Sequence, residues 1–402
     1  MAVEYQSFII DIKQNIGIIL VQEKENARLI LGTLVGGIIS LMVFSFSMVM
    51  IVLNQASSSL SPRVIPGLIT QKSHQIVLGM YLGTIIYCLI LIINIQSSNA
   101  KYQIPTLGIL FAMIFGITCI GLFVYFIHSI SRSIQVDNIL DKIFHHTSRQ
   151  MATDNQQEDS VELPDTSTWS TIYTNHSGYL KKIDTSTLLK ICKKHNLTVL
   201  IMEHIGFFLV NGYPFLKVSE KVDKEVEEDI RSCFIFYIEE HVADHYLFGF
   251  KQISEIAVKA LSPGINDPGT AIKAIDMLSI LFIKKMKLKE KNYVLDEDKK
   301  LLVIFKKPTL EELLYENLTP IREYGKQDAT VMLNLIESLK NLAYADKDNR
   351  SYQPVISKYI RSMVISCEKH ITNDLDMEQL DRMIEKINTL LGGDYYVKGL
   401  EG

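Results

Sequence analysis

The stretch LILGTLVGGIISLMVFSFSMVMIVLNQASSS, residues 29–59, decides the fold, because residues 29–53 carry no charge over 25 positions. At ~1.5 Å of rise per residue, a helix of this length crosses a bilayer core of ~30 Å. Small and polar residues recur along it at intervals of four and seven, so they share one helical face. These residues, which we name the polar stripe, are Gly32, Gly36, Ser40, Ser47, Asn54 and Ser58.

Two further uncharged runs follow, at residues 76–95 and 105–127. Together with residues 29–53 they predict a transmembrane domain at 29–135. Residues 1–28 are expected to be an amphipathic segment, because Asp11 and Lys13 interrupt the apolar run at 7–21 while its isoleucines share one helical face. The alternative for 7–21 is a first, degenerate transmembrane helix.

Composition excludes several classes of function. The net charge of −4 offers no basic field for nucleic acid, so no nucleic-acid partner is expected. Cys88, Cys119, Cys192, Cys233 and Cys367 lie far apart, which is typical of reduced, buried cysteines rather than of a zinc site or disulfide framework. The sequence has no nucleophile elbow, P-loop, Rossmann fingerprint or zinc-protease motif. We therefore predict no enzyme and no cofactor.

The charges that flank the spans do not decide the topology. Four Lys or Arg residues lie on each side: Lys13, Lys24, Arg28 and Lys101 against Arg63, Lys72, Arg132 and Lys142. We place the C-terminal region in the cytoplasm because it is long and has cysteines without a disulfide pattern. The expected location is therefore the inner, or plasma, membrane, with several spans.

The rest of the chain predicts an α+β cytoplasmic region, so the fold class is a multispanning helical region followed by an α+β region. Residues 136–167 are expected to be a connecting helix and an acidic linker, 168–221 a small β-rich module, 222–395 a mainly helical domain and 396–402 a tail. Within the helical domain, 292–308 predicts two strands around a polar turn. Helices are expected near 242–261, 268–288, 309–324, 328–344, 353–370 and 376–391.

A sharp corner is predicted between two of these helices. The first is expected to stop at Ser262-Pro263-Gly264, and Asp267 is placed to cap the second, whose first residue is Pro268. This capping chemistry is complete without a ligand, which favours a structural corner. In the alternative interpretation, side chains near the new helix N-terminus contact an anion, a small ligand or a neighbouring subunit. Those side chains are Ser262, Asn266, Asp267 and Thr270.

His241 and His245 are four residues apart, with Asp244 beside them. Such spacing on a helix can bind a divalent metal. A third ligand would have to come from elsewhere in the chain, and clusters of this kind are more often a solvated face. The sequence therefore predicts no metal site here.

Three motifs resemble a widespread prokaryotic family of predicted membrane proteins that is catalogued only as a domain of unknown function. They are ALSPGINDPGTAI at 260–272, LNQASSSLSPRVIPGLITQKSHQIVLGMYLGTIIYCL at 53–89 and YFIHSISRSIQV at 125–136. The resemblance implies a short multispanning N-terminal region and a cytoplasmic C-terminal region. It implies no activity, substrate or catalytic residue. Members usually have an extra span and a longer segment at the start, and this sequence departs from them there.

Two functions are compatible with these observations. In the first, the polar stripe lines the pore of a homo-oligomeric channel and the cytoplasmic region is its gate. In the second, the spans only anchor and associate, and the corner at 262–268 binds a ligand or partner of a membrane-tethered sensor or scaffold. No Asp, Glu, Lys or Arg lies inside the three spans, which argues against a proton-coupled pump or voltage sensor. The expected partners are the lipid bilayer, further copies of the chain, and ions or a small ligand.

Overall fold

The computed structural model describes residues 23–59, 72–97, 105–133, 135–153, 161, 163–237, 245–288 and 292–400. The chain forms two compact units. Unit 1 contains the N-terminal helices, and unit 2 runs from residue 139 to the C-terminus. Of the predicted amphipathic segment at 1–28, residues 1–22 lie outside the described residues.

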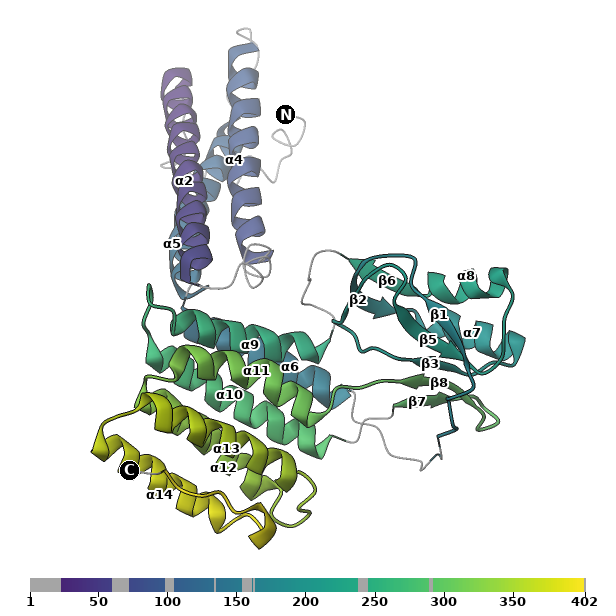
Figure 1. The fold of residues 1–402 in the computed structure, drawn as a ribbon. Helices are drawn as coiled ribbons and strands as arrows, with labels where there is room; N and C mark the ends of the chain where they lie inside the picture. The colour runs from purple at the N-terminus through teal and green to yellow at the C-terminus, as the bar shows by residue number, and fades with distance from the viewer. Residues whose placement is uncertain are drawn as a thin grey trace. The chain divides into compact units, whose positions relative to one another are not determined.

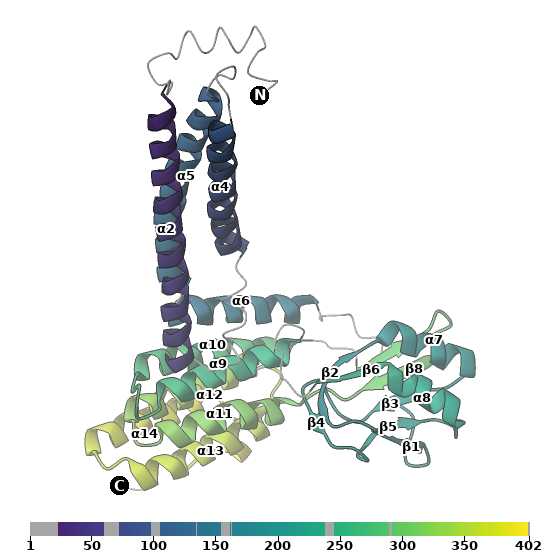
Figure 2. The same cartoon turned by 90° about the horizontal axis from the view of Figure 1, so that it is seen from above.

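Among its described residues, unit 1 contains three helices that are long and apolar enough to cross a membrane. They are α2 (Lys24–Ser59), α4 (Lys72–Ser97) and α5 (Thr106–Ser133), which Figure 2 shows side by side. The hydroxyl of Tyr87 donates to the Gly108 carbonyl at 3.1 Å, and the His74 ring contacts the Phe126 ring, so α4 and α5 are antiparallel. α2 also packs on α5: the Leu34 side chain of α2 occupies the space that a Cβ at Gly116 of α5 would need.

The helices of unit 1 pack through apolar side chains. Ile38 of α2, Tyr81 of α4 and Cys119 of α5 belong to one buried cluster, and Leu31, Cys88 and Ala112 belong to a second. The residues of α2 that enter these clusters lie on one face of the helix. Because α2 contacts neighbours on this face, its opposite face is left open within the unit.

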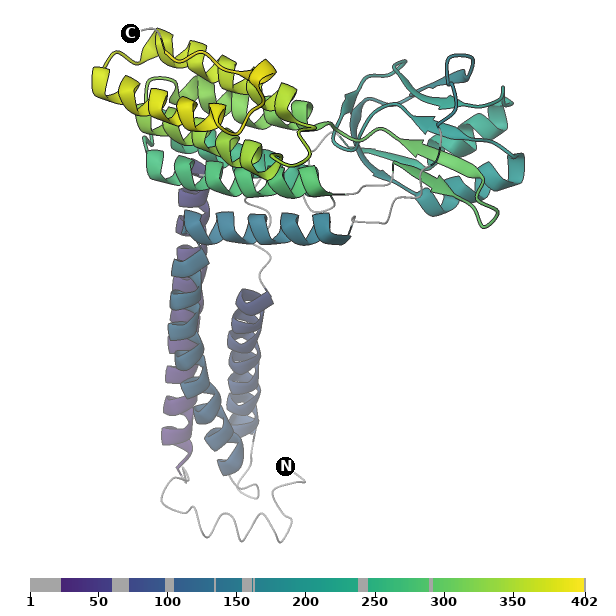
Figure 3. The ribbon, with the colours of Figure 1, turned by 90° about the horizontal axis from the view of Figure 1, so that it is seen from below.

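Unit 2 begins with a β module of two sheets, which Figure 3 shows in teal and green. The first sheet has the order β1-β5-β3-β8-β7 and the second the order β4-β2-β6. The strands are β1 (Ser170–Tyr173), β2 (Gly178–Ile183), β3 (Val199–Ile201), β4 (Phe208–Leu209), β5 (Pro214–Val218), β6 (Phe234–Tyr237), β7 (Tyr293–Leu295) and β8 (Leu301–Phe305). Helices α7 (Thr185–His195) and α8 (Lys224–Ser232) complete the module.

The β module extends beyond the predicted boundary of 168–221. β6 pairs with β2, and β8 pairs in parallel with β3, with Val199 opposite Val303. The Thr198 hydroxyl adds a hydrogen bond of 2.9 Å to the Leu301 carbonyl. The two strands predicted at 292–308 therefore belong to the β module and not to the helical domain. The sequence pattern identifies these strands, but β3, the parallel partner of β8, lies about a hundred residues earlier in the chain.

The remaining helices of unit 2 form a layered helical part, which Figure 1 shows in green and yellow apart from its first helix, which is blue. They are α6 (Val136–Thr153), α9 (Tyr246–Ala260), α10 (Pro268–Lys287), α11 (Leu310–Gly325), α12 (Ala329–Ala345), α13 (Gln353–His370) and α14 (Asp374–Asn388). Side-chain caps start several of them: Thr309 and Glu312 form a reciprocal capping box at α11, and Asp328 caps α12. The predicted tail at 396–402 is packed as far as residue 400, because Val397 is buried and its N–H donates to Asn388 at 2.9 Å.

A close helix contact joins α6 to this helical part. A Cβ added to Gly249 of α9 would overlap the Thr147 hydroxyl of α6 and would lie 2.8 Å from its Cβ. Thr147 is buried. An ion pair of 3.3 Å between Asp141 and Lys273 joins the same face of α6 to α10. The missing side chain at Gly249 therefore lets α6 approach α9.

We expect Gly249→Ala to lower the free energy of unfolding by about 1–3 kcal/mol, because the new methyl group overpacks this contact. Thermal or denaturant unfolding of the full chain in detergent measures the change. Adding Thr147→Ala should recover part of the loss, because it removes the overlapping hydroxyl. Gly393→Ala is the control, since its Cβ would meet nothing within 4 Å. Equal stability of the Gly249 and Gly393 variants would contradict the close contact.

The order of the three helices generates a prediction of topology. Because α4 runs antiparallel to α5, a reporter inserted at Arg63 and one inserted at Lys101 should lie on opposite sides of the membrane. We expect the Arg63 reporter and a tag after Gly402 both to be cytoplasmic and the Lys101 reporter to be external. Protease protection or reporter fusions measure this. Finding Arg63 and Lys101 on the same side would contradict the prediction.

Candidate functional site

The polar stripe lies on the outer face of unit 1. Gly36, Ser40, Ser47 and Asn54 of α2 are all exposed, whereas Ile38 and Ser45, on the opposite face, are buried. A Cβ added to Gly32 or Gly36 would meet nothing within 4 Å. The stripe therefore packs against neither α4 nor α5. Ser58 lies in α2, but its side chain is outside the described residues.

The hydroxyl groups of the stripe bond to their own helix. Ser40 Oγ donates to the Gly36 carbonyl and Ser47 Oγ to the Val43 carbonyl, each at 2.9 Å. Such bonds make a hydroxyl tolerable in an apolar environment and leave its lone pairs free to accept a bond from water or from a second chain. Val43 and Met50 alternate with the polar residues on this face and are 60% and 52% exposed. The stripe is thus a surface on which polar and apolar side chains alternate.

Sequence analysis missed a second set of polar residues, inside unit 1. Ser45, His74, Tyr81 and Thr84 are buried between the helices. Thr84 Oγ1 lies 3.5 Å from Cys119 Sγ on α5. The signal was present in the sequence, because positions 74, 81, 84 and 88 are spaced by seven, three and four residues and so share one face of α4. These polar groups lie on the core side and are separate from the stripe.

The predicted corner forms as expected at the end of α9, and its polar groups bond to one another. Asp267 caps α10: its carboxylate accepts the Thr270 N–H at 3.1 Å and the Thr270 hydroxyl at 2.6 Å. The Ser262 hydroxyl donates to the Lys259 carbonyl at 2.6 Å. Asn266 adopts a φ of 49°, a left-handed conformation that asparagine tolerates. The structure thus brings Ser262, Asn266, Asp267 and Thr270 together in a corner that local bonds explain.

Of the weak metal candidates, only His245 lies within the described residues. It is the N-cap of α9, and its Nδ1 accepts the Leu247 N–H at 3.3 Å. His241 and Asp244 fall outside those residues. Among the residues that the structure describes, no group of three His, Cys, Asp or Glu side chains could hold a metal ion.

Sequence analysis also missed a groove between α11 and α13, which we name the α11–α13 groove. It has a volume of about 590 Å³ and is lined by basic and hydroxyl side chains of both helices. The most informative of these are Arg322, Lys326, Arg361, Ser362, Ser366 and His370. Positions 322 and 326 are one turn apart, as are 358, 362, 366 and 370, so the pattern on each helix is visible in the sequence. The sequence does not show, however, that the two helices face each other.

Comparison with known proteins finds relatives that share most of this chain. A family model described as "Predicted membrane protein (DUF2254)" matches residues 2–341. An uncharacterized protein of Mycobacterium bovis is 23% identical over 361 residues, covering 82% of this chain and 66% of its own length. An uncharacterized protein of Mycobacterium tuberculosis strain H37Rv matches with the same values. The chain thus spans just under two thirds of the length of these relatives. No solved structure matches it.

The corner generates a prediction about stability. Asp267→Ala should lower the free energy of unfolding by ~0.5–2 kcal/mol, because it removes the cap of α10. Asp267→Asn or Asp267→Ser should nearly restore it, since both side chains can accept the same N–H. Denaturant unfolding measures all three. If Asp267→Asn keeps stability but abolishes activity, the corner contacts a ligand.

The pH dependence of the same variants provides a second test. Hydrogen bonds from the Thr270 hydroxyl and N–H hold the pKa of Asp267 below its ordinary value of 3.8. The stability that this carboxylate contributes is therefore fully present above pH ~4 and is lost as pH falls through the folded-state pKa. Asp267→Asn should lack this part of the acid transition. An identical acid dependence in the parent and the Asn variant would contradict the assignment.

Proposed function

Because the chain belongs to the DUF2254 family of predicted membrane proteins, we propose that it is a homo-oligomeric, pore-forming protein of the cell membrane with a cytoplasmic gating unit. The observation that carries the proposal is the position of the polar stripe. Gly36, Ser40, Ser47 and Asn54 lie on the face of α2 that α4 and α5 leave open. A polar face of a membrane helix is directed toward protein or water, because lipid offers no partner to its hydroxyl and amide groups.

In this proposal, self-association of the chain forms the enclosed pathway for ions or solutes. Three helices do not enclose a pathway, whereas copies related by rotation around one axis form a closed ring. In that ring the α2 helices approach through Gly32 and Gly36, which have open space beside them. The larger side chains of Ser47 and Asn54 then line the axis on the end of α2 that leads toward α4. An axis lined by hydroxyl, amide and apolar groups passes ions or small solutes without fixed charge.

Unit 2 is proposed to be the gate. Its first helix, α6, begins at Val136, only three residues after α5 ends at Ser133. Such a short connection transmits a movement of α6 to the third span with little loss. The close packing of Thr147 against Gly249 in turn holds α6 to the helical part of unit 2. In this proposal, a rearrangement in unit 2 moves α6, and α6 moves the third span through the short connection.

We expect single cysteines at positions 47 and 54 to react with a small, water-soluble thiol reagent, because the proposed pore is hydrated. The background is Cys88→Ala with Cys119→Ala, and both native thiols are buried. Reaction of Ser47→Cys or Asn54→Cys should change the ion flux of reconstituted liposomes. Phe46→Cys is the matched control: Phe46 is 60% exposed on a neighbouring face of α2, where lipid should shield the thiol.

A substitution without chemical modification tests the same proposal. Ser47→Leu should suppress flux by dewetting a narrow part of the pore, whereas Val49→Leu, on the face of α2 that packs in the core of unit 1, should not. The purified protein must also be a homo-oligomer in detergent or nanodiscs. A monomer, or an oligomer with unreactive cysteines at 47 and 54 and no flux above that of empty liposomes, would contradict the proposal. The stripe would then be a packing surface of a membrane-tethered sensor.

A further inference from the structure

The α11–α13 groove collects more hydrogen-bond donors and positive charge than its own acidic groups can match. Lys326 and Arg322 contribute from α11, and three more cations contribute from α13. Two acidic side chains, Glu323 and Asp394, line the same groove. Five positive charges and two negative ones line the groove, but Lys358 pairs with Glu311 outside it at 2.5 Å, so the net charge with this partner included is +2. The three cations from α13 are Lys358, Arg361 and Lys369.

Arg322 is held in a fixed position at the groove. Its Nη1 donates to the Ser362 hydroxyl at 2.5 Å, and its Nε and Nη2 donate to Glu323 Oε1 at 3.2 and 2.7 Å. The side chain is only 20% exposed. Glu323 also pairs with Lys326 at 3.2 Å. Bonds from Arg322 and Lys326 hold the pKa of Glu323 below its ordinary value, so the carboxylate stays ionised and positions both cations.

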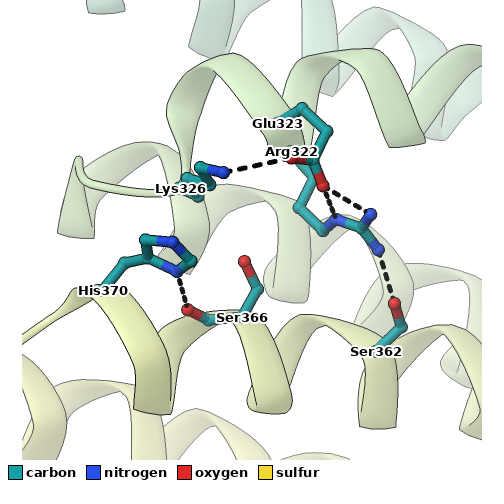
Figure 4. A network of polar contacts seen from close by, with 6 residues as sticks. All are labelled: Arg322, Glu323, Lys326, Ser362, Ser366 and His370. Atoms are coloured by element: carbon teal, nitrogen blue, oxygen red, sulfur yellow. Dashed lines mark hydrogen bonds and ion pairs between the residues drawn. The ribbon is translucent and has the colours of Figure 1, made fainter.

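The α13 side of the groove presents a hydroxyl and an imidazole. His370 Nδ1 lies 2.9 Å from the Ser366 carbonyl, which can only accept, so Nδ1 carries the hydrogen and Nε2 is left for another partner. Ser366 is 9% exposed, yet it lines the groove. Figure 4 shows Lys326, His370, the Ser366 hydroxyl and the Arg322 guanidinium around one opening between the two helices.

This arrangement differs from an ordinary solvated row of charges. Exposed lysines and arginines of a solvated face extend into water, whereas Arg322 and Ser366 are mostly covered and point into a concave surface. A point cation, a planar guanidinium and a hydroxyl group around one opening match a tetrahedral anion with several acceptor oxygens. The volume is in the range of small-molecule sites.

We propose that the α11–α13 groove is a binding site for a phosphate ester, either of a small soluble molecule or of a lipid headgroup. The phosphoryl oxygens accept hydrogen bonds from Lys326, Arg322 and Ser366, and the His370 ring lines the same groove. Lys369 and Arg361, at the exposed rim, attract the anion from solution. This site is independent of the polar stripe, and it stands whether or not the protein forms a pore.

The test measures binding to the full chain in phosphatidylcholine nanodiscs by calorimetry at low salt. Inorganic phosphate, adenosine monophosphate and glycerol 3-phosphate are the soluble probes. We expect binding of at least one of them, weakened by added salt. Lys326→Gln should lower the affinity about tenfold or more, because it removes a charged hydrogen bond. The double variant Lys326→Gln, His370→Gln should lower it further.

A matched control separates the groove from general surface charge. Arg382→Ala removes an exposed cation of α14 that pairs with Glu378 and does not line the groove, so its affinity should equal that of the parent. Melting temperatures of all variants show whether each is folded. Arg322→Lys keeps the charge but loses the planar guanidinium, and it should weaken binding while leaving the melting temperature close to that of the parent.

A second arm distinguishes the two sources of the phosphate. Nanodiscs that contain phosphatidylglycerol should compete with the soluble probe if the natural ligand is a headgroup, and should leave its affinity unchanged if the ligand is soluble. Either result supports a phosphate site, provided that Lys326→Gln removes the effect. Absence of binding for all probes in both kinds of nanodisc would overturn the proposal. Equal affinities of Lys326→Gln and Arg382→Ala would overturn it as well.

Discussion

Water is absent from the core of a bilayer, and most of the structure depends on this constraint. Each backbone N–H and C=O group in that region has to be satisfied within its own segment, which selects helices. α2, α4 and α5 meet the requirement with spans that carry no Asp, Glu, Lys or Arg. The hydroxyl groups of Ser40, Ser47 and Thr84 each donate to the carbonyl four residues earlier in the same helix. The same constraint makes each remaining polar atom on the outer face informative.

Unit 2 buries its apolar side chains in cores of its own, because removing apolar surface from water is favourable. The β module does this with a shared core between two small sheets and two helices, which includes Ile172, Leu180 and Cys192. The helical part does it by layers, with Phe250 of α9 in contact with Phe282 of α10. Charge therefore collects on the surfaces that remain, and in the α11–α13 groove it collects on two facing helices. The spans at 29–53, 76–95 and 105–127 carry no Asp, Glu, Lys or Arg, whereas unit 2 has a concave basic surface.

Local signals were sufficient to predict the helices. The uncharged runs predicted α2, α4 and α5, although α2 starts at Lys24 and so extends beyond the predicted span at 29–53. A cap identified the start of α10, through Asp267 with Pro268, and the helix expected near 309–324 corresponds to α11. Each of these signals lies within one or two turns of the feature that it predicts, so no knowledge of the tertiary fold is needed to recognise it.

Long-range relations could not be predicted in the same way. Periodicity placed the residues of the polar stripe on one face of α2, but whether α4 and α5 cover that face depends on how the helices pack. The strands at 292–308 were recognised, yet nothing in their sequence names β3 as the partner of β8. The groove has the same origin, because Arg322 and Ser362 are forty residues apart in the chain and meet only when α11 packs on α13.

The parallel pairing of β3 with β8 has a consequence for synthesis on the ribosome. The strands of the first sheet up to β5 are complete by residue 218, but β8 does not leave the ribosome until α9 and α10 have been made. Until then β3 presents an unpaired edge that other chains could join. Closing the sheet over such a separation is also slow compared with forming local helices. Ribosome pausing after α10, or a chaperone that covers the nascent β3 edge, would therefore have its largest effect on the yield of this protein during translation of residues 219–292, which contain no described strand of that sheet.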